Sequence, residues 1–574
     1  MKKFTADFET TTDPDDCRVW AWGMCEIGDP ENYIYGNNLD DFFKLLADKK
    51  HNYLLYFHNL KFDGEFIFNY LLHNGYECIK DKNERKAKTF TTLISNMGQF
   101  YSIEIYFDVS NNGKKVNKVT IYDSLKLLNF SVDKIAKDFK LPINKLELDY
   151  NTNREVGHQL TDHEIAYLRN DVEIMARALQ IMFNRGLTKM TIGSNALSFY
   201  KSTITSFNNY FPVSPLEIDS QIRESYKGGF TYLNPKYREK TTGAGIVLDV
   251  NSMYPSIMRY QKLPFGDPVY FEGEYKEDKL YNLYVQTLVC DFKIKPGKIP
   301  SIQIKNSKYS FIPTEYIESS NELLVTLTLT NIDLELFFEQ YDVYNVKYLG
   351  GWKFKSVCGL FSKYIDYWSE EKIKAKKDNN GANYLICKLM LNNIYGKFGT
   401  NPKVKSKYPY LDPETDIVRY KSYPEETKDS VYVAIASFVT SYGRRYIIEN
   451  SQRIRDYSIE KYGEDYYIYS DTDSIHTRIT DEEYLKSFLD IDDYKLGALK
   501  IESKFTKGSY IRQKCYIELM DNGKLNVTIA GLPKKLSDKI NFKNFKKNFS
   551  TAGKLVFKHT KGGIVLTDTT FTIK

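Results

Sequence analysis

Short apolar segments alternate with longer amphipathic segments through residues 1–189. The short segments FTADFET, YLLYFHN, YSIEIYF and KVTIYD have the length and the aromatic and β-branched content of buried strands. The longer segment KFDGEFIFNYLLHNG has helical spacing and ends at Gly75, a residue type that commonly terminates helices. This alternation predicts an α/β domain.

The segment 161–186 has the most regular helical periodicity in the chain. Thr161 and Glu164 form the pattern of a capping box, and Gly186 follows the last periodic residue. Between them, apolar residues recur at helical spacing, at Ile165, Leu168, Val172, Met175, Leu179 and Met182. We predict one long helix with a single apolar face.

The pattern becomes more varied after residue 190. GIVLDVNSMYPS predicts a strand that leads through a turn into a helix, and NYLICKLMLNNIYGKF and YVAIASFVTSYGRRYIIENSQRIRD predict further helices. Residues 261–360 are mixed and rich in strand-like segments. The segment KLVFKHTKGGIVLTDTTFTIK predicts a terminal hairpin that turns at Gly562 and Gly563.

Composition adds limits on class and compartment. The 574 residues suffice for two or more domains, and 42% hydrophobic with 27% charged residues is typical of soluble globular proteins. We expect neither a membrane span nor a secretory signal, because no apolar run is long enough and none follows the N-terminal lysines. Seven dispersed cysteines without a CxxC pair indicate reduced thiols and no zinc site.

The net charge of +6 is weakly basic and does not by itself indicate a nucleic-acid partner. Lysine-rich clusters at 372–377, 403–407 and 543–547 fit either solvated surfaces or phosphate contacts. The 47 tyrosines suit contacts with sugars and bases, although an AT-rich coding sequence would produce the same bias.

Acidic residues in the first domain could form a metal site. Asp7 and Glu9 lie two apart on a predicted strand and so face the same way, an arrangement that by itself fits an exposed strand edge better. Asp63 begins the next helix, and Tyr167 and Asp171 lie one turn apart on another. If these four acids converge, two Mg²⁺ or Mn²⁺ ions could activate a water for phosphodiester hydrolysis, with Tyr167 orienting it.

A second acidic set comes from two segments far apart in the chain. DVNSMYPS places Asp249 at a strand end shortly before Tyr254, and SDTDS places Asp471 and Asp473 in a tight turn between two predicted strands. An isolated Asp-Thr-Asp is most often an ordinary turn, because Asp is common there. Only the fold could bring the two segments together.

These segments resemble the motifs of a known enzyme family. DFET, HNLKFD and YLRND, in this order, resemble the exonuclease motifs of proofreading DNA polymerases. DVNSMYPS, KLMLNNIYG and SDTDS resemble motifs A, B and C of family B DNA polymerases, and YKGG (226–229) and KCY (514–516) resemble two further family motifs. With its two insertions, the chain resembles the protein-primed family B polymerases of small tailed bacteriophages over nearly its whole length.

The resemblance implies an α/β and α+β multidomain fold, in which a ribonuclease-H-like 3′–5′ exonuclease domain precedes a right-hand polymerase domain with two terminal-protein-region insertions. The expected boundaries are 1–189 for the exonuclease domain, 190–260 and 429–529 for the palm, 261–360 for the first insertion, 361–399 for the fingers, 400–428 for the second insertion and 530–574 for the thumb.

The resemblance also implies that the polymerase active site holds two Mg²⁺ or Mn²⁺ ions, the same number as the exonuclease site. Asp249 and Asp473 would hold them with Asp471 alongside, and Val250 is a further metal- and nucleotide-binding position. The primer 3′-hydroxyl would attack the α-phosphate in line while pyrophosphate leaves.

Nucleotide contacts follow from motifs A and B. Lys388, Asn392 and Tyr395 share one helix face, which fits amphipathic packing poorly because it is not apolar. The resemblance implies that Lys388 neutralises the triphosphate and that Tyr254 and Tyr395 flank the nucleotide, with Tyr254 excluding a ribose 2′-hydroxyl.

One departure concerns the triphosphate lysines. Lys376 fits one of them, but Tyr384 stands where this subgroup tends to have another, so the basic wall would be thinner unless Lys377 substitutes.

Further DNA contacts are implied at matching positions. Lys145 would assist the exonuclease reaction. The expected single-strand contacts are Thr10, Asn59, Phe62, Ser124 and Leu125, and the expected primer-template contacts are Tyr226, Gly228, Gly229, Ser252, Lys514 and Tyr516.

The implied partners are primer-template DNA, single-stranded DNA, dNTPs and a terminal protein whose hydroxyl serves as primer. The first insertion would contact the terminal protein, and the second would provide processivity and strand displacement. We expect a monomer, or a heterodimer with the terminal protein, in the host bacterial cytoplasm.

Three alternatives stay open at this point. The chain could be an exonuclease whose polymerase half only binds DNA, a DNA-primed family B repair polymerase, or a non-enzymatic replication scaffold or single-strand binder. The scaffold would not need the acids at these positions. The absence of a GxxxxGK[ST] loop argues against ATP hydrolysis.

Overall fold

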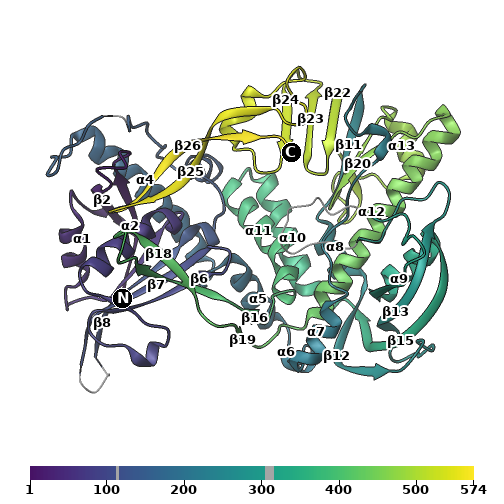
Figure 1. Ribbon diagram of the computed structural model, residues 1–574, viewed down its shortest axis with the longest axis horizontal. Helices are drawn as coiled ribbons and strands as arrows, with labels where there is room; N and C mark the ends of the chain where they lie inside the picture. Colours follow the sequence, from purple (N-terminus) through teal and green to yellow (C-terminus); the bar gives the residue numbers. More distant parts are fainter. Residues whose placement is uncertain (111–114, 151, 304–315) are drawn as a thin grey trace.

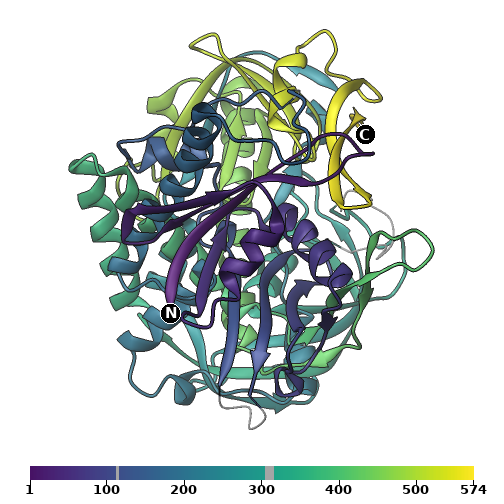
Figure 2. The ribbon, with the colours of Figure 1, turned by 90° about the vertical axis from the view of Figure 1, so that its left-hand side faces the viewer.

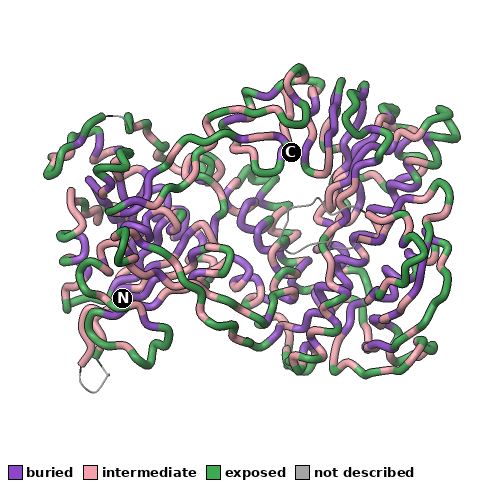
Figure 3. Tube along the Cα trace, in the orientation of Figure 1, coloured by how far each residue is buried: buried purple, intermediate pink, exposed green. Residues whose placement is uncertain are grey.

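A computed structural model describes residues 1–574 except 111–114, 151 and 304–315. Residues 304–315 of the predicted first insertion, and 111–114 and 151 of the predicted exonuclease domain, therefore lie outside the described residues. In Figure 1 the N-terminal part, coloured purple, occupies one end of the molecule, and the rest of the chain forms the middle and the other end. The buried residues gather inside both parts (Figure 3).

The N-terminal part is built on one mixed sheet. In Figure 2 the end of the molecule that contains this part faces the viewer. Its main strand order is β18 (Val418–Ser422), β17 (Ser406–Leu411), β6 (Thr89–Ser95), β7 (Phe100–Val109), β8 (Val116–Asp123), β4 (Tyr53–Phe57), β1 (Lys2–Thr10), β2 (Val19–Glu26) and β3 (Asp29–Gly36), and the short β5 (Glu77–Cys78) pairs with β6. The central strands β1, β4 and β8 are parallel, as expected for buried strands joined by crossovers. The strands predicted here from apolar runs are all present.

Helices α1 (Leu39–Leu46), α2 (Leu60–His73), α3 (Val132–Asp138) and α4 (Asp162–Asn184) complete this part. The predicted capping box begins α4: Thr161 accepts from the Glu164 backbone N–H, and the Glu164 carboxylate accepts from that of Thr161 at 3.0 Å. The α4 helix packs on β1 and β2 with the apolar face predicted for it, which includes Leu168 and Val172.

Two strands of this sheet come from the predicted second insertion. The β17–β18 hairpin joins the edge of the N-terminal sheet, where Ser406 pairs with Ser95 and Lys407 with Ile94. Residues 400–428 therefore dock on the N-terminal domain, although their sequence lies between segments of the polymerase region.

The second large sheet carries the motifs of the polymerase region. Its main strand order is β24 (Leu525–Ile529), β23 (Cys515–Met520), β22 (Leu499–Arg512), β11 (Gly245–Val250), β21 (Ser474–Thr477), β20 (Tyr467–Asp471) and β9 (Thr231–Leu233). These strands pair in antiparallel fashion, and α12 (Val433–Tyr462) packs against β20 and β21. The central place of β11 puts its C-terminal end beside the β20–β21 turn.

Residues 261–360 form a separate four-stranded sheet with a helix, in the described part of that range. The strand order is β12 (Lys262–Phe271), β15 (Tyr341–Cys358), β13 (Leu283–Ile294) and β14 (Val325–Thr330), and α9 (Asn331–Gln340) packs on α12. Two neighbouring helices follow, α10 (Ser362–Lys377) and α11 (Gly381–Phe398), which pack together between the two ends of the molecule (Figure 1).

The chain ends in the predicted hairpin, β25 (Ser550–Thr560) and β26 (Gly563–Thr572). Figure 1 shows this yellow hairpin extending from the C-terminal sheet to the N-terminal part, where β26 contacts α2. Gly562 has a φ of +90°, and a Cβ there would lie 1.9 Å from the Cys17 carbonyl oxygen, so the turn requires glycine. Among the described residues, no helix is long and apolar enough to cross a membrane.

Candidate active sites

The acids of the N-terminal domain come together from three elements. Asp7 and Glu9 lie on β1, Asp63 on α2 and Asp171 on α4. Burial, and then the negative charge of Asp171, raise the pKa of Asp7 to about 7. Burial, and then the charges of Asp7 and Asp171, raise the pKa of Glu9. Burial, and then the charge of Asp7, raise the pKa of Asp63. The four predicted acids therefore share one electrostatic environment.

Lys145 and a pair of tyrosines surround these acids. The Lys145 ammonium donates to Asp171 Oδ2 and lies 5.3 Å from the ring centre of Tyr167. The Tyr167 hydroxyl makes a 2.7 Å hydrogen bond with that of Tyr150. We did not predict Tyr150, because it lies in an irregular segment without a recognisable pattern.

The prediction that these acids hold two metal ions stays a prediction. Among the described residues, no group of three or more His, Cys, Asp and Glu side chains is arranged to hold a metal ion. The buried carboxylates of Asp7 and Asp171 repel each other, and the Lys145 ammonium is bound to Asp171. The donor set nevertheless fits a hard divalent cation, because Asp171 Oδ1 is buried without a hydrogen-bond partner.

The predicted single-strand contacts lie next to these acids. Asp123 Oδ1 accepts the backbone N–H of Asn59 at 3.1 Å and that of Leu125 at 3.0 Å, which ties their two loops together. Ser124 follows Asp123, and Thr10 ends β1 next to Glu9. The Phe62 ring lies 6.1 Å from that of Phe557 on β25. The terminal hairpin thus reaches the predicted path of a single strand.

The two distant acids of the polymerase region are neighbours in the second sheet. Asp249 on β11 pairs with Ser474 on β21, and the Val250 N–H donates to the Asp473 carbonyl oxygen at 2.8 Å. Burial raises the pKa of Asp473 to about 6, and the negative charge of Asp249 contributes next. The fold therefore brings the two predicted acids together.

Two charged side chains that we did not predict, Lys500 and Glu502, lie close to Asp249. Lys500 Nζ lies 3.1 Å from Asp249 Oδ1. Burial and then the charge of Asp249 raise the pKa of Glu502, which is therefore a further acid of this site. Both lie on β22, a strand without a motif in the sequence, so only pairing of β22 with β11 reveals them.

Asp471 faces the KCY segment. The Lys514 ammonium donates to both Asp471 carboxylate oxygens, at 2.7 and 2.8 Å, and the Tyr469 hydroxyl donates to Oδ2 at 3.1 Å. The Lys514 backbone N–H in turn donates to the Tyr469 hydroxyl at 3.0 Å. The Tyr516 ring stacks on Tyr510 with centroids 5.5 Å apart. These contacts hold the KCY segment against the turn that carries Asp473.

The predicted nucleotide contacts of α8 (Met253–Tyr260) and α11 meet beside the acids. The rings of Tyr254 and Tyr395 have centroids 4.3 Å apart. Lys388 and Asn392 are exposed on α11, as predicted for a helix face that is not part of the core. Lys376 Nζ lies 5.3 Å from the ring centre of Tyr494.

A lysine outside the predictions points toward motif A. Lys372 Nζ, on α10, donates to the Ser252 hydroxyl at 3.0 Å. Lys372 belongs to the lysine-rich cluster seen in the sequence, but nothing in the sequence distinguishes it from the other lysines of that cluster.

The YKGG loop packs closely against the same site. A Cβ on Gly229 would lie 2.8 Å from Thr472 Cγ2 and 3.0 Å from the Tyr254 hydroxyl, so only glycine fits without displacing them. A Cβ on Gly399, just after α11, would likewise lie 2.6 Å from the Tyr226 hydroxyl. The loop therefore touches both the motif C turn and the end of α11.

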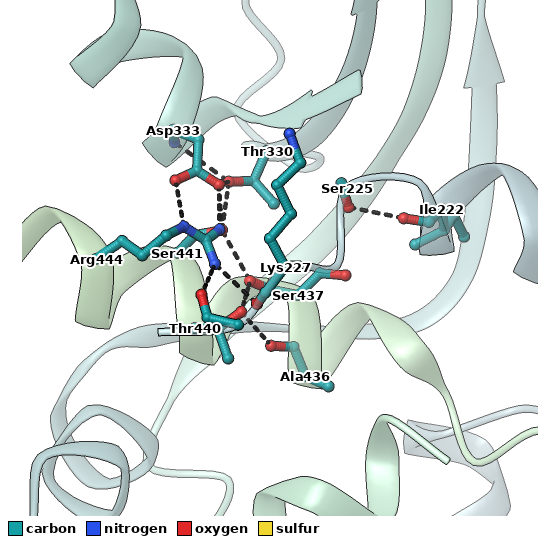
Figure 4. Close-up of polar contacts among 11 residues, drawn as sticks. Ile222, Ser225, Lys227, Thr330, Asp333, Ala436, Ser437, Thr440, Ser441 and Arg444 are labelled. Carbon is teal, nitrogen blue, oxygen red and sulfur yellow. Dashed lines mark hydrogen bonds and ion pairs between the residues drawn. The ribbon is translucent and has the colours of Figure 1, made fainter. Parts of the chain in front are cut away.

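Arg444 on α12 binds the backbone of this loop (Figure 4). Its guanidinium donates to the Lys227 and Gly228 carbonyl oxygens at 2.9 and 2.8 Å, and to Asp333 Oδ1 and Oδ2 on α9 at 3.1 and 2.5 Å. Arg444 and Asp333 are both buried. This pair links the predicted first insertion to the YKGG loop, a connection that the sequence does not indicate.

Comparisons with known proteins show the family of this chain. The sequence profile of the family described as DNA polymerase type B, organellar and viral, matches residues 47–491. The chain belongs to this family. This type B polymerase is 44% identical to the DNA polymerase of Bacillus phage B103 over the full length of both chains. It is 43% identical to that of Bacillus phage phi29, covering 100% of this chain and 99% of the relative.

Solved structures support the fold of the type B polymerase. The structure of phi29 DNA polymerase complexed with primer-template DNA and incoming nucleotide substrates matches with a TM-score of 0.92 and 42% identity over all of both chains. The same protein complexed with single-stranded DNA matches with a TM-score of 0.90. The predicted multidomain fold, an exonuclease domain followed by a right-hand polymerase domain, is confirmed.

Proposed function

We propose that this type B polymerase performs two reactions at two separate sites. Template-directed addition of dNTPs takes place at Asp249 and Asp473, and 3′–5′ removal of nucleotides takes place at Asp7, Glu9, Asp63 and Asp171. The observation that supports the first site best is the hydrogen bond from Val250 to Asp473, which sets the two acids side by side.

We assign Mg²⁺ to both sites, with two ions at each site and Mn²⁺ as a substitute. The bound ions would supply activation of the attacking oxygen and stabilisation of the leaving oxygen. The proposed ligands are the acids above, together with Val250. Asp473 fits this role because burial and Asp249 raise its pKa to about 6, a cost that a bound cation offsets.

In the synthesis reaction the chain's own residues orient the nucleotide. Tyr254 and Tyr395 form a rigid aromatic floor, since their rings touch each other and the Tyr254 hydroxyl approaches Gly229. Lys388 and Lys376 supply positive charge for the triphosphate, and Asn392 lies on the same face as Lys388. Lys514 holds the primer end while it remains hydrogen-bonded to Asp471.

In the removal reaction the single strand lies across the N-terminal acids. Thr10, Asn59, Phe62, Ser124 and Leu125 are the proposed contacts, and Phe62 offers a ring on which a base can stack. Lys145 and Tyr167 position the attacking water, with Tyr150 fixing the Tyr167 hydroxyl.

We also propose that synthesis begins on a terminal protein, whose hydroxyl replaces a nucleic-acid primer, and that it proceeds with strand displacement. Full-length identity of 43–44% to polymerases of Bacillus phages supports this. The separate sheet of residues 261–360 is the proposed contact with the terminal protein, and the β17–β18 hairpin is the proposed strand separator. The enzyme would act in the host cytoplasm, as a monomer or paired with the terminal protein.

A primer-extension assay tests the proposal directly. An Asp7→Ala variant, in which degradation is disabled, should extend a primer with dNTPs and Mg²⁺; absence of extension contradicts synthesis at the second site. Incubation with candidate terminal proteins and labelled dATP should yield a covalent protein–nucleotide adduct. Absence of an adduct with every candidate would favour a DNA-primed repair polymerase.

A further inference from the structure

A buried histidine–glutamate pair joins the motif C strand to the strand of the KCY segment. His476 lies on β21 and Glu518 on β23, and β11 and β22 lie between these two strands in the sheet. Both side chains are buried, and His476 Nδ1 lies 2.7 Å from Glu518 Oε1. The contact therefore reaches across the two strands that separate its members.

The Glu518 carboxylate has a further hydrogen-bond donor at each of its oxygens. The Tyr510 hydroxyl donates to Oε1 at 2.6 Å, and Asn526 Nδ2 donates to Oε2 at 3.3 Å. Burial by itself would raise the pKa of Glu518, but the charge of His476 and these hydrogen bonds lower it overall. Glu518 is therefore ionised. Because a carboxylate only accepts hydrogen bonds, the proton of its bond with His476 lies on Nδ1.

The ring of His476 packs against tyrosines of both segments. Its centroid lies 5.2 Å from that of Tyr469 and 5.2 Å from that of Tyr516. The Tyr469 hydroxyl binds the motif C turn, and Tyr516 belongs to the KCY segment. Tyr510, which donates to Glu518, stacks on Tyr516 with an interplanar angle of 24°. The pair therefore holds Tyr516 through two neighbouring rings.

We propose that His476 and Glu518 are positioning residues for the primer terminus, and that they act through Tyr516 and Tyr469 to favour addition of a nucleotide over its removal. This inference rests on the proposed synthesis and removal sites. Misplacement of a reacting group by about 1 Å can cost about 10²-fold in rate. The rings that hold the primer end must therefore be held firmly themselves.

The removal site does not share this support. Its acids lie on β1, α2 and α4 of the N-terminal domain, whereas both members of the pair lie in the second sheet. A primer end that is held less firmly at the synthesis site leaves it more often and reaches the removal site. Weakening the pair should therefore shift the balance toward degradation without slowing the degradation of a single strand.

Breaking the pair from one side leaves buried polar groups without their partner. His476→Leu removes a donor from a buried carboxylate, and Glu518→Leu removes the acceptor of three donors. Leaving one buried partner unpaired is costlier than replacing both partners with apolar groups. The double variant should therefore lose less than the two single variants combined.

The experiment follows a matched primer-template at increasing dNTP concentrations and records the concentration at which net extension replaces shortening. We expect each leucine variant to need about tenfold more dNTP than wild type, with degradation of single-stranded DNA unchanged. Independent effects would multiply to about a hundredfold in the double variant, and we expect far less. Effects that do multiply would show that the two residues do not act as a pair, which contradicts the proposal.

An exposed ion pair on α13 (Glu482–Phe488) supplies the matched control. Lys486 Nζ lies 2.8 Å from Glu483 Oε1. Exposed pairs of this kind contribute little to stability, so Lys486→Gln, Glu483→Gln and their combination should show the wild-type balance between extension and degradation.

A second measurement separates positioning from a general loosening of the polymerase region. In an Asp171→Ala background, in which the removal site is disabled, the leucine variants should raise the KM for primer-template about tenfold and change the KM for dNTP far less. Equal increases in both would indicate a structural role and overturn the inference. A wild-type balance in a leucine variant that still folds would also overturn it.

Glu518→Gln decides the question if the leucine variants do not fold. It keeps the shape of the side chain and an acceptor, but it replaces charge-assisted hydrogen bonds with weaker ones, so the required dNTP concentration should rise about threefold. Wild-type behaviour of this variant contradicts the proposal. If wild-type enzyme extends no primer at all, the proposed synthesis site fails instead, which is a distinguishable result.

Discussion

The Val250 N–H donates to the carbonyl oxygen of Asp473 at 2.8 Å, which joins the end of β11 to the β20–β21 turn. This one bond sets Asp249 beside Asp473, and the repulsion between them contributes to the raised pKa of Asp473. The acids of the N-terminal domain lie on β1 of a different sheet and on the helices α2 and α4. The two sets can therefore be altered independently.

Asp473→Ala should abolish primer extension and leave degradation of single strands intact. Removing a proposed metal ligand costs several kcal/mol of transition-state stabilisation, so we expect at least about a 10³-fold loss. Extension of a labelled primer and degradation of a labelled single strand, followed on gels, measure both activities. Comparable loss of the two would show that the sites are not separate.

Asp171→Ala should have the opposite effect. Asp171 binds the Lys145 ammonium and contributes to the raised pKa of Asp7, so its removal changes the N-terminal site alone. Degradation should fall at least about 10³-fold, while extension continues. Loss of extension in this variant, with a normal melting temperature, would contradict the assignment.

Asp7 should make stability depend on pH in the absence of metal. Its pKa is about 7 in the folded protein and 3.8 in the unfolded chain, so between these values the folded state binds the additional proton. The free energy of unfolding contributed by Asp7 therefore falls as pH rises through this interval.

Asp7→Asn removes this dependence. In EDTA the variant should melt a few degrees above wild type at about pH 8 and show little difference at about pH 3, where Asp7 is protonated in the folded protein and largely protonated in the unfolded chain. Adding Mg²⁺ at the higher pH should reduce or reverse the difference, because a cation favours the carboxylate. A difference that is the same at both pH values would contradict the raised pKa.

Tyr254→Val should weaken discrimination against ribonucleotides. The Tyr254 ring is held by Tyr395, 4.3 Å away, and by the close approach of Gly229, so it cannot move aside for a 2′-hydroxyl. We expect the ratio of kcat/KM for dNTP over NTP to fall at least about tenfold. Tyr260→Phe, an exposed position on the same helix, serves as the control. An unchanged ratio would place the nucleotide sugar elsewhere.

The buried pair of Arg444 and Asp333 should be costly to break from one side. Arg444→Met leaves the Asp333 carboxylate without its partner and should destabilise the protein by about 3–5 kcal/mol in urea unfolding. Combining it with Asp333→Leu should recover much of this loss. If the double variant is as unstable as the sum of the single ones, the two residues do not act as a pair.

Local patterns were sufficient for several of the helices and strands. The capping box of Thr161 and Glu164 begins α4 as predicted, and Gly562 forms the terminal turn with a positive φ. These features depend on residues close together in the chain, whose hydrogen bonds and backbone preferences are the same in any fold. Even the exposed face of Lys388 and Asn392 follows from helical spacing alone.

The arrangement of the elements in space depends on contacts between segments that are far apart in the sequence. The β17–β18 hairpin joins the N-terminal sheet, although its sequence follows the helices α10 and α11. The contact of Lys372 with Ser252, and that of Arg444 with Asp333, involve residue types that are ordinary on a protein surface. The sequence by itself determined the predicted helices and strands and the acidic residues of the motifs. Which lysine reaches those acids, and which helix supports which loop, depended on packing between segments that local spacing does not encode.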